Sequence, residues 1–330
     1  MADMSTNTEN MQSIRLGSRG PTVSRVGFGA WAIGGMNWGP TDDDVSMAAL
    51  NAALDAGVTF LDTADVYGFG HSEKLIARLI RERKPENLVV ATKAGNDFYN
   101  ACAEDDKGFG PIRQTYDKDY IIFAAEQSLK RLGVEALDIL QLHSGDAGQI
   151  ARDEPWEALA ELKRQGKIRH AGWSVQSFQE TAQADVLDAR HEILDVIQVR
   201  YNVLERAAED VLLPKAQQYG IGVIVRIPLL FGLLAGKFTR DSRFGEDDHR
   251  HMNLSPEKLD EHLAELEALD DWYARFPGES KAQVSLRFCI SHPACHTVIP
   301  GAKTPQQVQD NCRAGVLGPL PAHQLPPRSA

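Results

Sequence analysis

Short runs of apolar residues recur along this chain, and longer stretches with a helical spacing of apolar positions separate them. Most of the runs lack the alternation of polar and apolar residues that marks a half-exposed strand. Continuous runs of this kind are typical of parallel strands that are buried on both faces. We therefore predict eight strands, at residues 23–31, 58–67, 87–95, 136–144, 168–175, 195–202, 221–230 and 296–302.

The stretches between these runs carry the start and stop signals of helices. Thr41 is expected to cap a helix that ends at Gly57, and Ser72 precedes an apolar helical pattern. A helix over 119–132 is expected to end at Gly133, and another to begin near Pro155 and end at Gly166. Thr304 followed by Pro305 is expected to open the last helix.

Eight strands with helices between them indicate a parallel sheet, and eight is the number that closes a barrel. We therefore expect an α/β protein with the (β/α)8 TIM-barrel fold over residues 13–317. Two connections, 95–118 and 229–256, are longer than the others and follow the third and seventh strands. Barrel enzymes place their active-site loops at this end of the strands.

The two ends of the chain differ from its middle. Residues 11–22 contain turn residues between two short runs and predict an N-terminal β-hairpin at the barrel bottom. The polar residues 1–12 are expected to form a flexible N-terminus. Residues 318–330 contain four prolines and are expected to form a tail outside the core.

Composition limits the partners and the compartment. The net charge of −11 argues against nucleic acid or an anionic membrane, because both attract basic patches. No apolar run reaches the roughly 18 residues of a membrane span, and the polar start lacks the apolar core of a signal peptide. We expect a cytoplasmic protein with a small-molecule substrate, and a homo-oligomer is left open. The four cysteines (Cys102, Cys289, Cys295 and Cys312) form no CxxC pair and fit reduced thiols.

Four polar residues interrupt apolar runs at predicted strand ends: Asp62, Tyr67, Lys93 and His143. Each has a structural explanation when taken alone, as a turn cap, a packed ring, a snorkelling lysine and a satisfied core histidine. Their joint occurrence on three adjacent strands favours a catalytic site, because barrel chemistry lies at the C-terminal ends of strands.

This combination suits the reduction of a carbonyl group, in which hydride reaches carbon and a proton reaches oxygen. A phenol with an ordinary pKa near 10 holds a proton at neutral pH and can donate it. The Lys93 ammonium is expected to favour the phenolate and to make Tyr67 a better acid. Asp62 would keep Lys93 charged and oriented, and His143 would hydrogen-bond the substrate oxygen.

Three segments that contain these residues resemble the catalytic segments of the aldo-keto reductase superfamily: FLDTADVYG at 60–68, TKAG at 92–95 and LQLHS at 140–144. That family is a (β/α)8 barrel whose Asp, Tyr, Lys and His serve NAD(P)H-dependent carbonyl reduction. The resemblance extends over residues 14–315, and it implies that the catalytic residues are Asp62, Tyr67, Lys93 and His143.

The resemblance also implies a nicotinamide site. It places Gly29 and Trp31 near the nicotinamide, beside Asp62, and it makes Ser174 and Gln198 the residues that hold the carboxamide. The chain departs from the family at two positions. Val175 follows the serine where the family often has Asn, and Arg226 replaces an aromatic residue that often stacks on the nicotinamide, a role that a guanidinium plane can also fill.

The segment 298–314 resembles the part of the family that binds the adenosine phosphate, and a helix N-terminus there suits phosphate. The resemblance implies that Lys303 binds the 2′-phosphate that distinguishes NADP(H), and for this reason we favour NADP(H) over NAD(H). The other candidates are Gly301, Gln307, Asp310 and Asn311 in this segment, and Pro228, Leu229, Gly232, Leu234 and Lys237 in a loop expected to cross the cofactor.

We therefore expect an NADPH-dependent reductase of aldehydes or ketones. Trp31, Trp38, Tyr67 and His143 are expected to contact substrate, with the 95–118 connection as a further wall. No metal is expected, because DDHRH at 247–251 has the composition of a solvated loop and contains no HExxH motif. Two alternatives stay open: an NAD-dependent sugar or alcohol dehydrogenase, and a non-catalytic cofactor-binding regulatory subunit, since the family includes potassium-channel β subunits.

Overall fold

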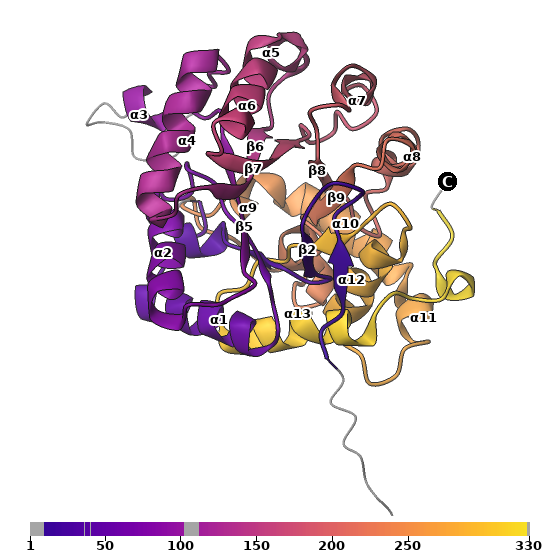
Figure 1. Cartoon of the computed structure of the whole chain (residues 1–330). Helices are drawn as coiled ribbons and strands as arrows, with labels where there is room; N and C mark the ends of the chain where they lie inside the picture. Colours follow the sequence, from indigo (N-terminus) through magenta and orange to yellow (C-terminus); the bar gives the residue numbers. More distant parts are fainter. Residues whose placement is uncertain (1–9, 36, 40, 102–111, 329–330) are drawn as a thin grey trace, which may run out of the picture.

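A sheet of eight parallel strands forms the centre of the molecule in the computed structural model, which describes residues 10–35, 37–39, 41–101 and 112–328 (Figure 1). The two ends of this sheet are joined by parallel bridges between Val26 and Val298 and between Gly29 and Gly301. The predicted (β/α)8 barrel is therefore confirmed. In spatial order its strands are β3 (Phe28–Gly29), β4 (Phe60–Asp62), β5 (Val89–Ala94), β6 (Leu137–His143), β7 (Ile168–Ser174), β8 (Val196–Arg200), β9 (Gly222–Arg226) and β10 (Thr297–Val298).

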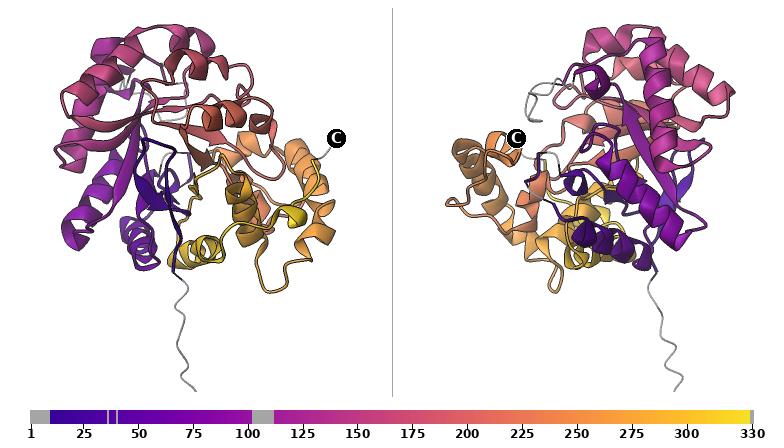
Figure 2. Two further views of the ribbon diagram at one scale, coloured as in Figure 1. Left: turned by 45° about the vertical axis from the view of Figure 1, so that its right-hand side comes forward. Right: turned by 90° about the vertical axis from the view of Figure 1, so that its left-hand side faces the viewer.

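Helices surround this barrel (Figures 1 and 2). No helix among the described residues is long and apolar enough to span a bilayer. The helices of eight or more residues are α1 (Asp43–Asp55), α2 (His71–Arg83), α4 (Lys118–Leu132), α6 (Glu154–Arg164), α10 (Pro256–Glu267), α12 (Lys281–Ser291) and α13 (Pro305–Leu317). The shorter ones are α3 (Phe98–Ala101), α5 (Ala147–Ala151), α7 (Asp185–Arg190), α8 (Leu212–Gln218), α9 (Arg250–Asn253) and α11 (Asp270–Tyr273), with 3-10 turns η1 (Ala32–Gly34), η2 (Ala207–Glu209), η3 (Leu230–Ala235) and η4 (Ala322–Gln324).

Helix ends follow the expected chemistry with one correction. The cap of α1 is Asp42, not Thr41, because the Asp42 carboxylate accepts the backbone N–H of Val45 at 2.9 Å. Thr304 caps α13 as predicted and accepts the N–H of Gln307. The helix α13 therefore begins directly after Thr304.

The N-terminal hairpin closes the lower end of the barrel. Its strands β1 (Ser13–Arg15) and β2 (Thr22–Ser24) pair antiparallel. Leu16 is fully buried and packs inside the barrel with Phe60 and Ile139. The hairpin extends two residues further than predicted, so residues 23 and 24 belong to it and not to the first barrel strand.

The C-terminal segment packs on the barrel, which corrects the expectation of a tail outside the core. Leu320 is 4% exposed and belongs to the main hydrophobic core. The indole N–H of Trp272, in α11, donates to the Gln324 carbonyl at 2.7 Å, so the segment runs back along this side of the molecule (Figure 1). Residues 1–9 of the predicted flexible N-terminus lie outside the described residues.

Candidate active site

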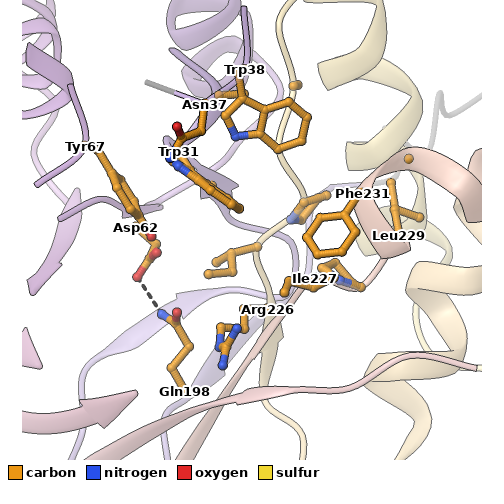
Figure 3. Close-up of a pocket in the computed structure, with 18 of the residues that line it drawn as sticks. Trp31, Asn37, Trp38, Asp62, Tyr67, Gln198, Arg226, Ile227, Leu229 and Phe231 are labelled. Atoms are coloured by element: carbon orange, nitrogen blue, oxygen red, sulfur yellow. Dashed lines mark hydrogen bonds between the residues drawn. The ribbon is translucent and has the colours of Figure 1, made fainter. Parts of the chain in front are cut away.

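The C-terminal ends of the strands open into a cavity of about 700 Å³ (Figure 3). Asp62, His143, Ser174 and Arg226 are the last residues of β4, β6, β7 and β9, and all four line this cavity. Parallel strands therefore bring together residues that are far apart in the sequence, as the barrel prediction required.

Lys93 lies beneath the cavity and connects two of the predicted catalytic residues. Its ammonium donates to Asp62 Oδ1 at 2.6 Å and to the Thr63 carbonyl at 2.7 Å. The Tyr67 hydroxyl lies 3.5 Å from the same ammonium. The buried cation is thus held on one side by a carboxylate and faces the phenol on the other.

Two amides complete the hydrogen bonding of Asp62. Gln198 Nε2 donates to Asp62 Oδ2 at 2.7 Å (Figure 3), and Gln141 Nε2 donates to the same oxygen at 3.2 Å. The carboxylate is therefore fixed from strands β6 and β8 as well as by Lys93. Sequence reasoning missed Gln141, because a single glutamine inside an apolar strand gives no indication of its partner.

The turn after β4 places Tyr67 at the cavity wall. Gly68 follows it with a φ of 60°, and a Cβ at this position would lie 2.1 Å from the Gly34 carbonyl oxygen. Only glycine fits such a close backbone approach. The Trp31 ring lies alongside the phenol, with ring centroids 6.0 Å apart and an interplanar angle of 24°. Tyr67 is therefore held between the turn and an indole.

Lys93 favours the Tyr67 phenolate, as expected from the sequence, but burial has the larger and opposite effect. Burial raises the pKa of the phenol above 10, and the nearby Lys93 ammonium opposes that rise without cancelling it. The pKa of Lys93 is itself raised, because burial, which disfavours the ammonium, is outweighed by Asp62 and Tyr67. At neutral pH the site therefore holds a protonated phenol beside a charged ammonium.

His143 lies opposite the phenol, with its ring edge-on to Tyr67 and the centroids 5.9 Å apart. Burial lowers the pKa of His143 well below 6.5, and the positive charges of Lys93 and Arg226 lower it further. The imidazole is therefore neutral at pH 7 and available as a hydrogen-bond donor to a ligand in the cavity.

The residues predicted for the nicotinamide are brought together. Gly29, Trp31, Ser174 and Gln198 line the same cavity as Asp62. Because the Gln198 amide nitrogen donates to Asp62, its amide oxygen is the atom left to accept from a ligand.

The two departures from the family pattern are in direct contact. Arg226 Nη2 donates to the Val175 carbonyl at 2.8 Å and to Ser177 Oγ at 3.0 Å. Its buried Nε has no partner within the part of the chain that the structure describes. Burial lowers the pKa of the guanidinium, and the neighbouring Arg200 lowers it further. Arg226 therefore presents an incompletely bonded cation to the cavity.

The predicted phosphate-binding residues divide into two groups. Gly301, Lys303 and Gln307 line the cavity beside the N-terminus of α13, and the Lys303 ammonium donates to the Trp38 carbonyl at 2.6 Å. Asn311 lies behind them, with its amide 3.5 Å from the Gly301 carbonyl. Asp310 points away from the cavity and accepts bonds from Ser280 and Gln283.

The predicted cofactor-crossing loop divides in the same way. Pro228, Leu229 and Gly232 line the cavity. Leu234 is fully buried in the hydrophobic core, and Lys237 is exposed to solvent. The first half of this loop therefore faces the cavity, and the second half supports it from behind.

A contact between two loops covers the cavity beside Trp31. Trp38 forms an antiparallel bridge with Asp248, and the His249 N–H donates to the Asn37 carbonyl at 2.9 Å. The His249 ring packs against both indoles, with centroids 4.5 Å from each. The expectation of a solvated loop at 247–251 was therefore wrong for Asp248 and His249, which are buried.

The predicted substrate residues Trp31, Trp38, Tyr67 and His143 all line the cavity, together with Asn96 and Ile112 from the long connection after β5. Residues 102–111 of this connection, including Cys102, lie outside the described residues. Among those that are described, no group of three or more potential ligand side chains is placed to hold a metal ion.

Comparison with known proteins agrees with this geometry. The model of the aldo/keto reductase family matches residues 25–326. The chain is 32% identical to the aldo-keto reductase YhdN of Bacillus subtilis, covering 91% of this chain and 87% of that protein. It is 31% identical to an NADH-specific methylglyoxal reductase of Escherichia coli, with 92% and 93% covered.

Two solved structures share the fold. A glycerol dehydrogenase from Gluconobacter oxydans superposes with a TM-score of 0.79 at 33% identity, covering 94% of this chain and 92% of that one. The holo form of an aldo-keto reductase from Bacillus halodurans superposes with a TM-score of 0.74 at 27% identity, covering 96% and 94%. This chain belongs to the aldo/keto reductase family of NAD(P)H-dependent oxidoreductases.

Proposed function

We propose that this protein reduces aldehydes or ketones to alcohols with NADPH, with Tyr67 as the general acid. The observation that carries this proposal is the position of the Tyr67 hydroxyl. It lies at the cavity wall, 3.5 Å from a buried ammonium whose other partners are Asp62 and the Thr63 carbonyl. That arrangement holds a proton at neutral pH and stabilises the anion formed when the proton leaves.

The polar atoms around the cavity fit a nicotinamide dinucleotide. Ser174 and the Gln198 amide oxygen supply a donor and acceptor pair for a carboxamide, and the N-terminus of α13 supplies backbone donors for phosphate. The orphaned Nε of buried Arg226 adds a donor that the protein alone leaves unused. When bound, the reduced nicotinamide supplies the hydride to the carbonyl carbon.

The side chains around the cavity orient the carbonyl group and supply its proton. His143 donates a hydrogen bond to the carbonyl oxygen and orients it toward Tyr67. Tyr67 transfers its phenolic proton to that oxygen as negative charge develops there, and Lys93 stabilises the phenolate left behind. Asp62 keeps Lys93 in place, and Trp31 and Trp38 exclude water from this side of the cavity.

The preference for NADPH rests on Lys303. Lys303 lines the cavity together with Gln307, and among the described residues its ammonium donates to the Trp38 carbonyl and not to a carboxylate. Burial lowers the pKa of Lys303, Arg250 lowers it further, and the carboxylates of Asp248 and Asp247 only partly oppose them. A 2′-phosphate would pair with the Lys303 ammonium, whereas the ribose hydroxyl of NADH would not.

A second function is favoured by the relatives. One is named a glycerol dehydrogenase and another an NADH-specific reductase, so the second candidate function of this site is NAD-dependent oxidation of alcohols or sugars. A plant relative, 31% identical, is named a probable voltage-gated potassium channel subunit β, which keeps a regulatory role as the third candidate.

One assay separates these functions. The purified chain is given NADPH or NADH with a panel of aldehydes, ketones and aldoses, and NADP⁺ or NAD⁺ with the matching alcohols, while absorbance at the reduced-nicotinamide band is followed. We expect the highest kcat/KM for NADPH with an aldehyde or ketone. Faster oxidation of an alcohol with NAD⁺ would replace this proposal with the second function, and no turnover of the whole panel would refute both.

A further inference from the structure

Two short segments of the connection after β5 pair with each other beside His143. Asn96 and Gln114 face each other across an antiparallel bridge, and the Asp97 N–H and Thr115 N–H donate across the same pair. The Tyr120 hydroxyl donates to the Asn96 carbonyl at 3.0 Å. The backbone of Asn96 is therefore fixed from two sides, which leaves its side-chain amide to point at the imidazole.

The orientation of these amides follows from their partners. The Gln114 side-chain nitrogen lies 3.4 Å from the His143 carbonyl oxygen and 3.3 Å from the Ser144 carbonyl oxygen. Backbone carbonyls only accept hydrogen bonds, so the NH₂ end of Gln114 must face them. The opposite orientation would bring an amide oxygen against two other oxygens.

The same nitrogen also donates to Asn96 Oδ1 at 3.3 Å. The two amide hydrogens of Gln114 are thus shared among three oxygens, which is consistent with the long distances of 3.3–3.4 Å. With its oxygen turned toward Gln114, Asn96 presents its own NH₂ to His143, and Asn96 Nδ2 lies 3.0 Å from His143 Nδ1. An amide nitrogen donates and does not accept, so Nδ1 has to be the acceptor.

We propose that Asn96, oriented by Gln114, is a positioning residue that keeps His143 Nδ1 free of a proton and so makes Nε2–H the single donor of the ring. This proposal rests on the proposed function for its purpose, because the Nε2–H is the group that would meet the substrate oxygen. Which ring nitrogen of a histidine carries the proton is set by the bond that the other one makes.

The charges around the ring support a neutral imidazole, in which only one nitrogen is protonated. Burial disfavours a second proton on the ring, and the positive charges of Lys93 and Arg226 disfavour it further. A doubly protonated ring would also place an N–H against the Asn96 NH₂. Both effects favour the neutral ring with its proton on Nε2, which is the tautomer that the Gln114 and Asn96 amides select.

The test is nitrogen NMR of the full-length chain labelled with ¹⁵N-histidine, without substrate, at pH 6 and pH 7. Comparison with the variant His143→Gln identifies the signals of His143. We expect an unprotonated Nδ1 and a protonated Nε2 at both pH values. A protonated Nδ1 in the wild type, alone or together with Nε2, would overturn the proposal.

Two variants test the cause. Asn96→Asp replaces the donor with an acceptor, so the proton should move to Nδ1. Asn96→Leu, of similar shape, should give a mixture of both tautomers. Wild-type His143 signals in either folded variant would overturn the role of Asn96. If neither variant folds, Gln114→Leu removes the group that orients Asn96. We then expect a mixture of the two His143 tautomers, and unchanged His143 signals would contradict the proposal.

Kinetics separate this proposal from the proposed function. In Asn96→Asp we expect kcat for carbonyl reduction to fall roughly 100-fold, because the loss of a preorganised donor to a developing oxyanion has an effect of this size. The KM for NADPH should stay unchanged. Absence of turnover in the wild type would refute the proposed function, whereas the NMR result on the tautomer would still decide this inference.

Discussion

The ammonium of Lys93 lies 2.6 Å from Asp62 Oδ1, and the two side chains are only 1% and 3% exposed to solvent. Removing two charges from water costs free energy that their attraction repays only with good geometry and further hydrogen bonds. Those bonds are present, from Gln198 and Gln141 to the carboxylate and from Lys93 to the Thr63 carbonyl. The pair therefore provides a fixed cation beside Tyr67.

Removal of one member of this pair should destabilise the fold. In Lys93→Met the Asp62 carboxylate stays buried without its cation, and such a change costs about 3–5 kcal/mol of unfolding free energy. Urea unfolding of wild type and variant at pH 7 measures the difference. The double variant Lys93→Met with Asp62→Leu should recover part of the loss. A single variant within about 1 kcal/mol of wild type would show that the pair is not buried as described.

Stability should depend on pH through His249, which packs between Trp31 and Trp38. Burial lowers its pKa from 6.5 to about 4. Between these values the unfolded chain binds a proton that the folded protein does not, so stability falls as the pH falls from 6.5 toward 4. At about 1.4 kcal/mol per pH unit, His249 should account for a loss of about 2 kcal/mol between pH 7 and pH 5.

The variant His249→Phe keeps a ring among these indoles and lacks the titrating group. We expect its unfolding free energy to fall less than that of the wild type between pH 7 and pH 5, by about the amount assigned to His249. Equal pH dependence in the two proteins would contradict the buried, neutral position of this ring.

Lys303→Ala should reduce the preference for NADPH. Loss of a charge-assisted bond to phosphate costs about 1.5–3 kcal/mol, so the KM for NADPH should rise by roughly tenfold or more while the KM for NADH changes little. Lys74→Ala, at an exposed position of α2 outside the cavity, is the matched control and should change neither. An unchanged ratio of NADPH to NADH in Lys303→Ala would exclude Lys303 as the phosphate partner.

The sequence was sufficient to predict the barrel and the residues at its strand ends. Buried parallel strands leave apolar runs, and a polar residue such as His143 at the end of such a run is visible without a structure. The family resemblance then assigned roles to these residues. The position of Leu16 inside the barrel also follows from the predicted hairpin.

Other features depend on contacts that no local pattern records. Gln114 and Asn96 reach His143 only because two segments of one connection pair with each other. His249 is buried by Trp31 and Trp38, so a polar segment that resembles a solvated loop forms part of a wall. The net acidity of Tyr67 is another such feature, since burial raises its pKa by more than Lys93 lowers it.

The proposed mechanism depends most on Tyr67 as the source of the proton. The most direct measurement is kcat for NADPH-dependent carbonyl reduction by Tyr67→Phe, with NADPH binding followed by fluorescence and Tyr219→Phe, a surface tyrosine bonded to Asp188, as control. We predict that kcat falls about 10²–10⁴-fold in Tyr67→Phe, because general acid catalysis contributes this much, while the affinity for NADPH is kept. Turnover by Tyr67→Phe at the rate of the wild type would contradict the mechanism.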